Sequence, residues 1–74
     1  MSFLLALEIG KRIREFREFH DLTQGELALK TGLTPAAISM IEAGRRAPTA
    51  PTLIKLSDAL FVTTDRILKG ERRR

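Results

Sequence analysis

The chain has 74 residues, of which 43% are hydrophobic and 30% are charged, so its composition predicts one small globular domain and argues against a disordered or fibrous chain. It contains no cysteine, which excludes disulfides and thiolate metal sites and is typical of a cytoplasmic protein. The 13 Lys and Arg residues outnumber the 9 Asp and Glu residues, and the net charge of +4 favours a polyanionic partner.

Enzymatic and membrane functions find little support in the residues. The apolar run from Phe3 to Leu7 is too short to span a bilayer or to act as a secretory signal, so we expect no membrane association. His20 is the only histidine, and no Ser nucleophile lies in a recognisable catalytic setting, so the sequence predicts no metal, no cofactor and no enzymatic activity. We expect His20 to be a partly buried residue near the end of a helix.

The first predicted helix carries apolar and aromatic residues at spacings of four and three, which place them on one face: Leu5, Ile9, Ile13, Phe16 and His20. Charged residues occupy the other face, among them Arg12, Glu15 and Glu18. The pattern predicts an amphipathic helix whose cations form i,i+4 ion pairs such as Glu8 with Arg12.

The second and third predicted helices begin at clear capping signals. Thr23 can cap the second helix while Glu26, three residues on, bonds back to the Thr23 amide, and Gly32 supplies the positive φ that ends this helix. Thr34 can cap the third helix, with Pro35 in its first position, where the missing N–H has no cost.

Two further helices complete the predicted fold. Gly44 ends the third helix, and Thr49 can cap a fourth, with Pro51 in its first turn. Along the fourth helix, apolar residues recur at the spacing that turns side chains toward a hydrophobic core, at Leu53, Ile54, Leu56 and Leu60. A fifth short helix is predicted to start at Thr63 and to stop before Gly70. Its inward-facing residues are Ile67 and Leu68.

The second and third helices together have the form of a helix-turn-helix, two short helices joined by a short turn that contains a glycine. Counting from Gln24 as the first position, each constrained position holds a suitable residue: Ala28, Gly32, Leu33, Ile38 and Ile41. Ala28 is small where the helices cross, and Gly32 allows the turn. The sequence therefore predicts a helix-turn-helix over about residues 23–43.

The segment from Ile9 to Gly70 resembles the phage-repressor and Cro-like helix-turn-helix proteins, often called the XRE family, in the strings IGKRIREFRE, LTQGELALKTGLTPAAISMIEAGRR, AP and PTLIKLSDAL. The resemblance implies an all-α fold, a compact bundle of five short helices like the DNA-binding domain of lambda repressor. We expect residues 1–70 to form this single domain and residues 71–74 to be a basic, flexible tail.

The resemblance also implies that the helix from Pro35 to Ala43 enters the major groove of double-stranded DNA while the preceding helix lies across the backbone. The positions that would face base edges or adjacent backbone are Thr34, Pro35, Ala36, Ala37, Ser39 and Met40. The positions expected to contact phosphates are Gln24, by its place in the family motif, and the nearby cations Lys30, Arg45 and Arg46. Glu42 matches a family glutamate that we expect to organise a loop.

The predicted DNA-binding helix lacks the side chains that make the strongest base contacts. No Arg, Lys, Asn or Gln lies between Thr34 and Glu42, so bidentate recognition of guanine and adenine from this helix is excluded. Pro35, Ala36 and Ala37 can instead meet thymine methyl groups. We therefore predict modest direct discrimination among bases.

A homodimer is expected, because one copy offers few phosphate contacts and two copies side by side would place their DNA-binding helices about one turn of DNA apart, roughly 34 Å. Family precedent places the interface near the fifth helix, at Phe61, Val62, Thr64, Ile67 and Leu68, although these residues can alternatively cover the core of the monomer. Phe61 stands where the family often has a glycine. The fourth helix therefore cannot end at a residue that adopts a positive φ without steric cost. Phe3, Leu4 and Leu5 either pack across a two-fold axis or fold back.

The leading hypothesis is a sequence-specific DNA-binding transcriptional regulator, a repressor or controller, that binds a palindromic operator as a dimer. The alternative is a protein-interaction module with an unidentified protein partner, which keeps the fold but has lost base recognition. The apolar stretch from Pro35 to Ala37 prompts this alternative. A steep loss of DNA affinity with added salt distinguishes the regulator from the interaction module.

Overall fold

The computed structural model describes residues 2–70, which form five helices in the expected order. The helices are α1 (Phe3–Phe19), α2 (Gln24–Thr31), α3 (Pro35–Glu42), α4 (Ala50–Leu60) and α5 (Thr64–Lys69). The described residues contain no strand, which confirms the all-α prediction. None of the helices within residues 2–70 combines the length and the apolar character that crossing a membrane requires. The tail predicted at residues 71–74 lies outside the described residues.

Each of the five helices begins with a hydroxyl side chain that accepts a hydrogen bond from the backbone N–H three residues later. The capping residues are Ser2, Thr23, Thr34, Thr49 and Thr63. The caps at Thr23, Thr34 and Thr49 confirm the sequence prediction. Thr63 caps the helix that was predicted to start there, and Ser2 adds a cap that was not predicted. These caps satisfy backbone donors that a helix cannot pair internally.

Four helices end at a residue in the left-handed conformation, at Asp21 (φ 56°), Gly32 (φ 72°), Gly44 (φ 75°) and Phe61 (φ 57°). After α4, the Phe61 N–H donates to Asp58 and the Val62 N–H donates to Ser57, which is the Schellman pattern. The fourth helix therefore ends on a positive φ although no glycine is present. A residue with a Cβ bears a steric cost of about 1–2 kcal/mol in this conformation.

The hydrophobic core receives fully buried side chains from all five helices: Ile9, Ile13, Leu27, Ile38, Leu56, Leu60 and Ile67. The prediction that Ile54 belongs to the core is wrong, because its side chain is 55% exposed. With 3.6 residues per turn, Ile54 points about 100° away from Leu53. The buried side of α4 passes through Leu56, Ser57 and Leu60 instead.

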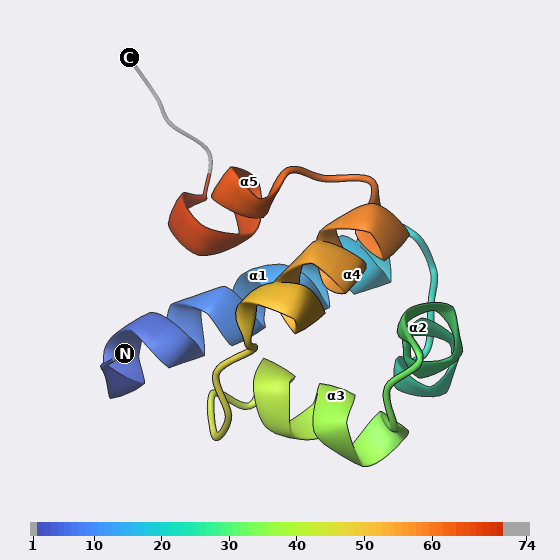
Figure 1. The fold of residues 1–74 in the computed structure, drawn as a ribbon, viewed down its shortest axis with the longest axis horizontal. Helices are drawn as coiled ribbons and strands as arrows, with labels where there is room; N and C mark the ends of the chain where they lie inside the picture. Colours follow the sequence, from blue (N-terminus) through green and yellow to red (C-terminus); the bar gives the residue numbers. More distant parts are fainter. Residues whose placement is uncertain (1, 71–74) are drawn as a thin grey trace.

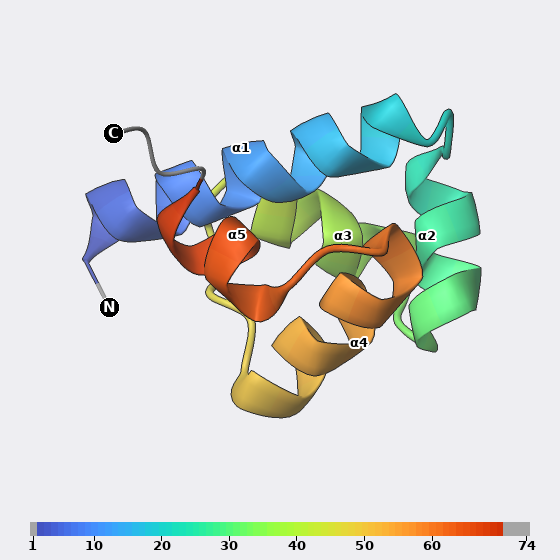
Figure 2. The same cartoon turned by 90° about the horizontal axis from the view of Figure 1, so that it is seen from above.

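Figure 1 shows α3 and α5 on opposite sides of α1, and the view from above in Figure 2 places α3 beneath α1 and α4 with α5 over them. The first turn of α1 extends beyond this bundle. Phe3 and Leu4 are 68% and 71% exposed, so they do not fold back onto the chain. Leu5, which was expected on the buried face, is also exposed because no other helix covers this end of α1.

The close contact between α1 and α3 depends on a glycine that the sequence analysis did not single out. A Cβ added at Gly10 would lie 2.2 Å from the carbonyl oxygen of Ile41 and 2.7 Å from that of Glu42. Both distances are far below van der Waals contact, and backbone atoms cannot rotate away. The absence of a side chain at Gly10 therefore sets how closely α1 approaches the end of α3.

Candidate nucleic-acid interface

The turn between α2 and α3 has the geometry expected of a helix-turn-helix. Gly32 adopts φ 72°, and the Leu33 N–H donates to the Ala28 carbonyl oxygen at 3.0 Å. Ala28 is 2% exposed where the two helices pack, and Leu27 and Ile38 are fully buried beneath the turn. These contacts fix the angle of α3 relative to α2, which confirms the roles predicted for Ala28 and Gly32.

One side of α3 is buried and the other faces solvent. Ile38 and Ile41 enter the core. Five of the six residues expected to face bases are exposed, and the sixth, Ala37, is half-buried: Thr34, Pro35, Ala36, Ala37, Ser39 and Met40. No other segment of the described chain covers this side, so it is accessible to a partner.

The two arginines that follow α3 lie at the edge of its exposed side. Arg45 and Arg46 are exposed, and Arg46 lines a small hollow together with Ala37 of α3 and Thr49 at the start of α4. Lys30 is placed elsewhere. It lies at the far end of α2 and lines a hollow with Lys55 of α4. The structure thus brings Arg45 and Arg46 beside α3 and separates Lys30 from them.

A buried ion pair joins α1 to the end of α3. Arg17 Nε and Nη2 donate to the two carboxylate oxygens of Glu42 at 2.6 and 3.0 Å, and the two side chains are only 12% and 4% exposed. This hydrogen bonding raises the pKa of Arg17 above its ordinary value. Arg17 Nη1 also donates to the Leu22 carbonyl oxygen at 2.8 Å. Glu42 therefore holds the α1–α2 connection through Arg17, in line with the predicted role in organising a loop.

Gln24, the first residue of α2, belongs to the same network. Its Nε2 donates to Glu42 Oε1 at 3.1 Å. Glu42 thus holds one N–H of the Gln24 amide, and the second N–H remains as a donor. Sequence analysis identified Gln24 and Glu42 but assigned no role to Arg17. Residues 17, 24 and 42 lie on three helices, so no local spacing signals their contact.

The start of α2 carries the predicted capping box. The Thr23 N–H donates to Glu26 Oε1 at 2.8 Å, and the Glu26 N–H donates to Thr23 Oγ1 at 3.0 Å. These hydrogen bonds lower the pKa of Glu26 below its ordinary value, and the bond from the Thr23 backbone N–H has the largest effect. The N–H groups of Gln24 and Gly25 have no partner within a helix, so they are available to an external acceptor.

Two further cations of α1, Arg12 and Arg14, serve the fold in different ways. Arg14 pairs with Glu18 at 3.2 Å, which is the expected i,i+4 arrangement. Arg12 does not follow the expectation of pairing with Glu8. Its Nη1 donates to the carbonyl oxygens of Ile67 and Leu68 at 3.2 and 3.0 Å, where a cation stabilises the C-terminal end of α5.

The residues expected at a dimer interface divide between core and surface. Ile67 is fully buried, so it belongs to the monomer core and takes no part in an exposed interface. Val62, Thr64 and Leu68 are half-buried, and Phe61 is 81% exposed.

The chain is similar to known helix-turn-helix proteins in both sequence and structure. The family model described as HTH_3, helix-turn-helix, matches residues 13–67. An uncharacterised HTH-type transcriptional regulator of Bacillus subtilis, YqaE, is 39% identical over 62 residues, which are 84% of this chain and 53% of YqaE. Multiprotein-bridging factor 1 of Candida albicans is 43% identical over 56 residues, which are 76% of this chain and 37% of that protein.

Among solved structures, the P22 c2 repressor in complex with a synthetic operator is 35% identical, with a TM-score of 0.82. The match covers 85% of this chain and 96% of the repressor chain. By contrast, the chain spans only about half or less of the two curated relatives above.

Proposed function

Because the chain belongs to the HTH_3 helix-turn-helix family, we propose that it is a transcriptional regulator that acts in the cytoplasm by binding double-stranded DNA. In this proposal, α3 lies in the major groove and α2 crosses the backbone. The observation that carries the proposal is the exposed side of α3, which is uncovered while the rest of the helix is held in the core. The similar P22 c2 repressor, solved in complex with a synthetic operator, supports double-stranded DNA as the partner.

Phosphate contacts are assigned to the start of α2 and to the loop after α3. Glu42 fixes the Gln24 side chain, so its second N–H can donate to a phosphate oxygen beside the free N–H groups of the helix end. Arg45 and Arg46 are exposed in the loop after α3, and Arg46 lies close to Ala37 of that helix, so both are assigned to phosphates beside α3. Lys30 is left out of the proposed contact because it lies beside α4.

Base recognition by this surface depends on apolar contact. Pro35, Ala36 and Ala37 meet thymine methyl groups, while Thr34 and Ser39 supply hydroxyls and Met40 reaches across the groove. Each thymine methyl buried against α3 is worth about 0.8 kcal/mol, or about fourfold in affinity. Direct discrimination is therefore modest, and the shape of base pairs that the protein does not touch supplies part of the specificity.

We propose that two copies bind a palindromic operator, as a repressor or controller would. The bundle measures 35 × 23 × 20 Å, so two copies in contact end to end along the longest axis suit half-sites one DNA turn apart, roughly 34 Å. Two copies also double the phosphate contacts that a small domain can make. The exposed and half-buried residues Phe61, Val62, Thr64 and Leu68 are assigned to the contact between copies.

Selection of bound duplexes from random DNA tests the proposal, followed by replacement of thymine with uracil in the selected site. We expect a palindromic site, and about fourfold weaker binding for each contacted thymine that loses its methyl group. A strict requirement for guanine opposite Ala36 or Ala37 would contradict the proposed apolar contacts. Recovery of a single half-site would contradict the proposal that the operator is palindromic.

A second candidate is a protein-interaction module. The apolar stretch from Pro35 to Ala37 favours it, as does the similarity to a protein named a bridging factor. Salt dependence separates the two candidates. The DNA affinity of a regulator falls steeply with added salt. The double variant Arg45→Ala, Arg46→Ala should reduce the slope of log affinity against log salt concentration by the equivalent of about two phosphate contacts. Lys11→Ala, on α1, is the control and should leave the slope unchanged. An interaction module shows no footprint on DNA even at low salt.

A further inference from the structure

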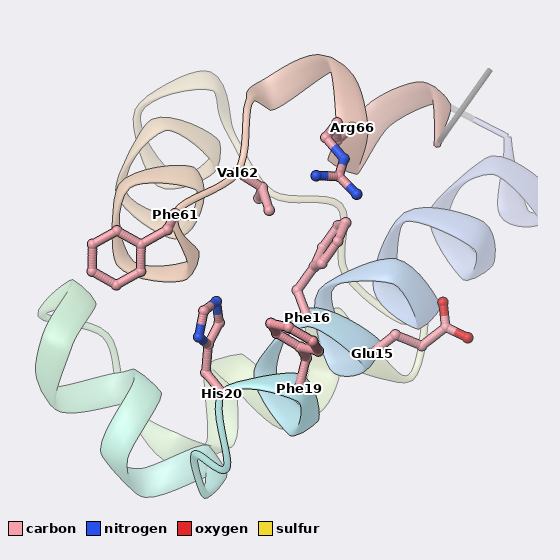
Figure 3. A pocket seen from close by; sticks show the side chains of 7 residues that line it. All are labelled: Glu15, Phe16, Phe19, His20, Phe61, Val62 and Arg66. Carbon is pink, nitrogen blue, oxygen red and sulfur yellow. The ribbon is translucent and has the colours of Figure 1, made fainter.

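Two hollows flank α1, and they differ in the side chains that line them. The first, of about 440 Å³, opens between the end of α1, the α4–α5 connection and α5 (Figure 3). We call this surface the aromatic groove, and its rings belong to Phe16, Phe19, His20 and Phe61. His20 is half-buried and lies between the exposed rings of Phe19 and Phe61, at 5.2 and 5.7 Å between centroids. Phe61 is already assigned to the contact between copies, so this groove belongs to that contact.

The second hollow, of about 290 Å³, lies where α1, α2 and α3 meet. We call it the polar hollow, and it is lined by Arg14, Arg17, Gln24, Ser39, Glu42 and Ala43. Arg14 and Arg17 lie two residues before Phe16 and Phe19, respectively, so they point to the opposite side of α1 from the aromatic groove. The polar hollow therefore opens on the face of the molecule that carries the start of α2 and the exposed side of α3.

The floor of the polar hollow is electrically balanced. Arg17 and Glu42 form the buried ion pair, and the Glu42 carboxylate accepts a third hydrogen bond from Gln24. The Glu42 side chain is only 4% exposed, and its charge is compensated by the adjacent guanidinium. An anion that enters the polar hollow is therefore not repelled by an open carboxylate at its floor.

Arg14 is the accessible cation of the polar hollow. Its side chain is 62% exposed, and its Nε donates to Glu18 Oε2 at 3.2 Å, with the Glu18 side chain 53% exposed. A guanidinium has five N–H donors, so this single bond leaves both of its NH₂ groups for another acceptor. An exposed ion pair of this kind is weak, and an arginine that precedes its glutamate by four residues has the less favourable order on a helix. A stronger anion can therefore displace Glu18.

We propose that Arg14 binds a phosphate of the DNA backbone at the polar hollow, and that Glu18 holds its guanidinium in the free chain and is exchanged for that phosphate. A guanidinium binds phosphate through two parallel N–H bonds, and each phosphate contact also releases counterions from the duplex. The inference rests on the DNA binding proposed above. It adds a phosphate contact from α1 to those assigned to α2 and to the loop after α3, and it makes Glu18 a residue that lowers the affinity for DNA.

Titration of the full chain with its selected duplex at several salt concentrations tests the phosphate contact. We expect Arg14→Gln to lower the affinity at low salt about tenfold. It should also reduce the slope of log affinity against log salt concentration by the equivalent of about one phosphate contact. Lys55→Gln is the matched control, because Lys55 is an exposed cation on α4, outside the polar hollow. Equal effects of the two substitutions would overturn the contact.

A second pair of variants tests the exchange. Glu18→Gln should raise the affinity of the wild-type chain about threefold, the size expected of one exposed ion pair, and should leave that of Arg14→Gln unchanged. An equal gain in both backgrounds would show that Glu18 repels the duplex directly, which overturns the exchange.

The outcome for Arg14 is separable from that of the proposed function. DNA binding that is weakened by Arg45→Ala with Arg46→Ala, but not by Arg14→Gln, overturns the present inference and leaves the proposed regulator intact. A wild-type chain that binds no duplex even at low salt overturns both.

Discussion

The α1–α3 junction and the aromatic groove lie on the same helix, α1, and are built in opposite ways. At the junction, which comprises Gly10, Arg17, Gln24 and Glu42, polar groups are buried and paired, and two backbones touch. No buried side-chain nitrogen or oxygen within residues 2–70 lacks a hydrogen-bond partner. In the groove, apolar rings are exposed and one backbone is strained. The junction therefore holds the monomer together, whereas the groove is left for another molecule.

Breaking the ion pair of the junction should have the largest effect. Glu42→Ala leaves the Arg17 guanidinium buried without its partner, so we expect the free energy of unfolding to fall by about 3–5 kcal/mol. Glu18→Ala is the matched control, because Glu18 pairs with Arg14 in solvent and its loss should cost less than about 1 kcal/mol. Urea unfolding of both variants at neutral pH measures the difference. Equal losses in the two would contradict the account of the junction.

A methyl group added within the junction should have the next largest effect. Gly10→Ala drives a Cβ into two backbone oxygens at the end of α3, and such overpacking costs about 1–3 kcal/mol or more. Gly25→Ala adds the same methyl group in α2, where the nearest atom is 3.8 Å away. There, we expect a gain of about 0.5–1 kcal/mol from helix propensity. Thermal melting compares them, and a stabilised Gly10→Ala would show that the two helices are not in close contact.

Phe61→Gly should have the smallest effect on stability and the opposite sign to the junction variants. Relief of the left-handed strain offsets the greater flexibility of glycine in the unfolded chain, so we expect a change between zero and a gain of about 1 kcal/mol. The comparison is made by urea unfolding at a concentration where the chain is monomeric. A loss above about 2 kcal/mol would mean that the ring stabilises the monomer, in contrast to its exposure.

The local features of the fold could be predicted from the sequence. The threonine caps, the capping box and the turn at Gly32 depend on residues within a few positions of one another, so their signals are contained in short stretches of chain. Ile54 was assigned to the wrong side of α4 because its neighbours Leu53 and Leu56 are equally apolar. Hydropathy alone does not choose among adjacent apolar residues on one helix.

The features that depend on distant residues could not be predicted from spacing. The partners Arg17 and Glu42 are 25 positions apart, and their contact requires α1 to cross the end of α3. Family resemblance supplied Glu42 but not its partner. The aromatic groove likewise gathers residues from three separate segments, and only the folded chain shows that Phe19 and Phe61 lie on either side of His20.

The central claim is that the exposed side of α3 contacts DNA while the aromatic groove does not. Two-dimensional NMR of the labelled chain, titrated with its selected duplex, tests this claim most directly. At a protein concentration where the chain is already dimeric before DNA is added, we predict that the backbone amide signals of Gln24, Gly25, Thr34 and residues 36–40 shift, and that those of Phe19, His20 and Phe61 remain unchanged. Shifts confined to the groove residues, with the α3 signals unmoved, would contradict the claim.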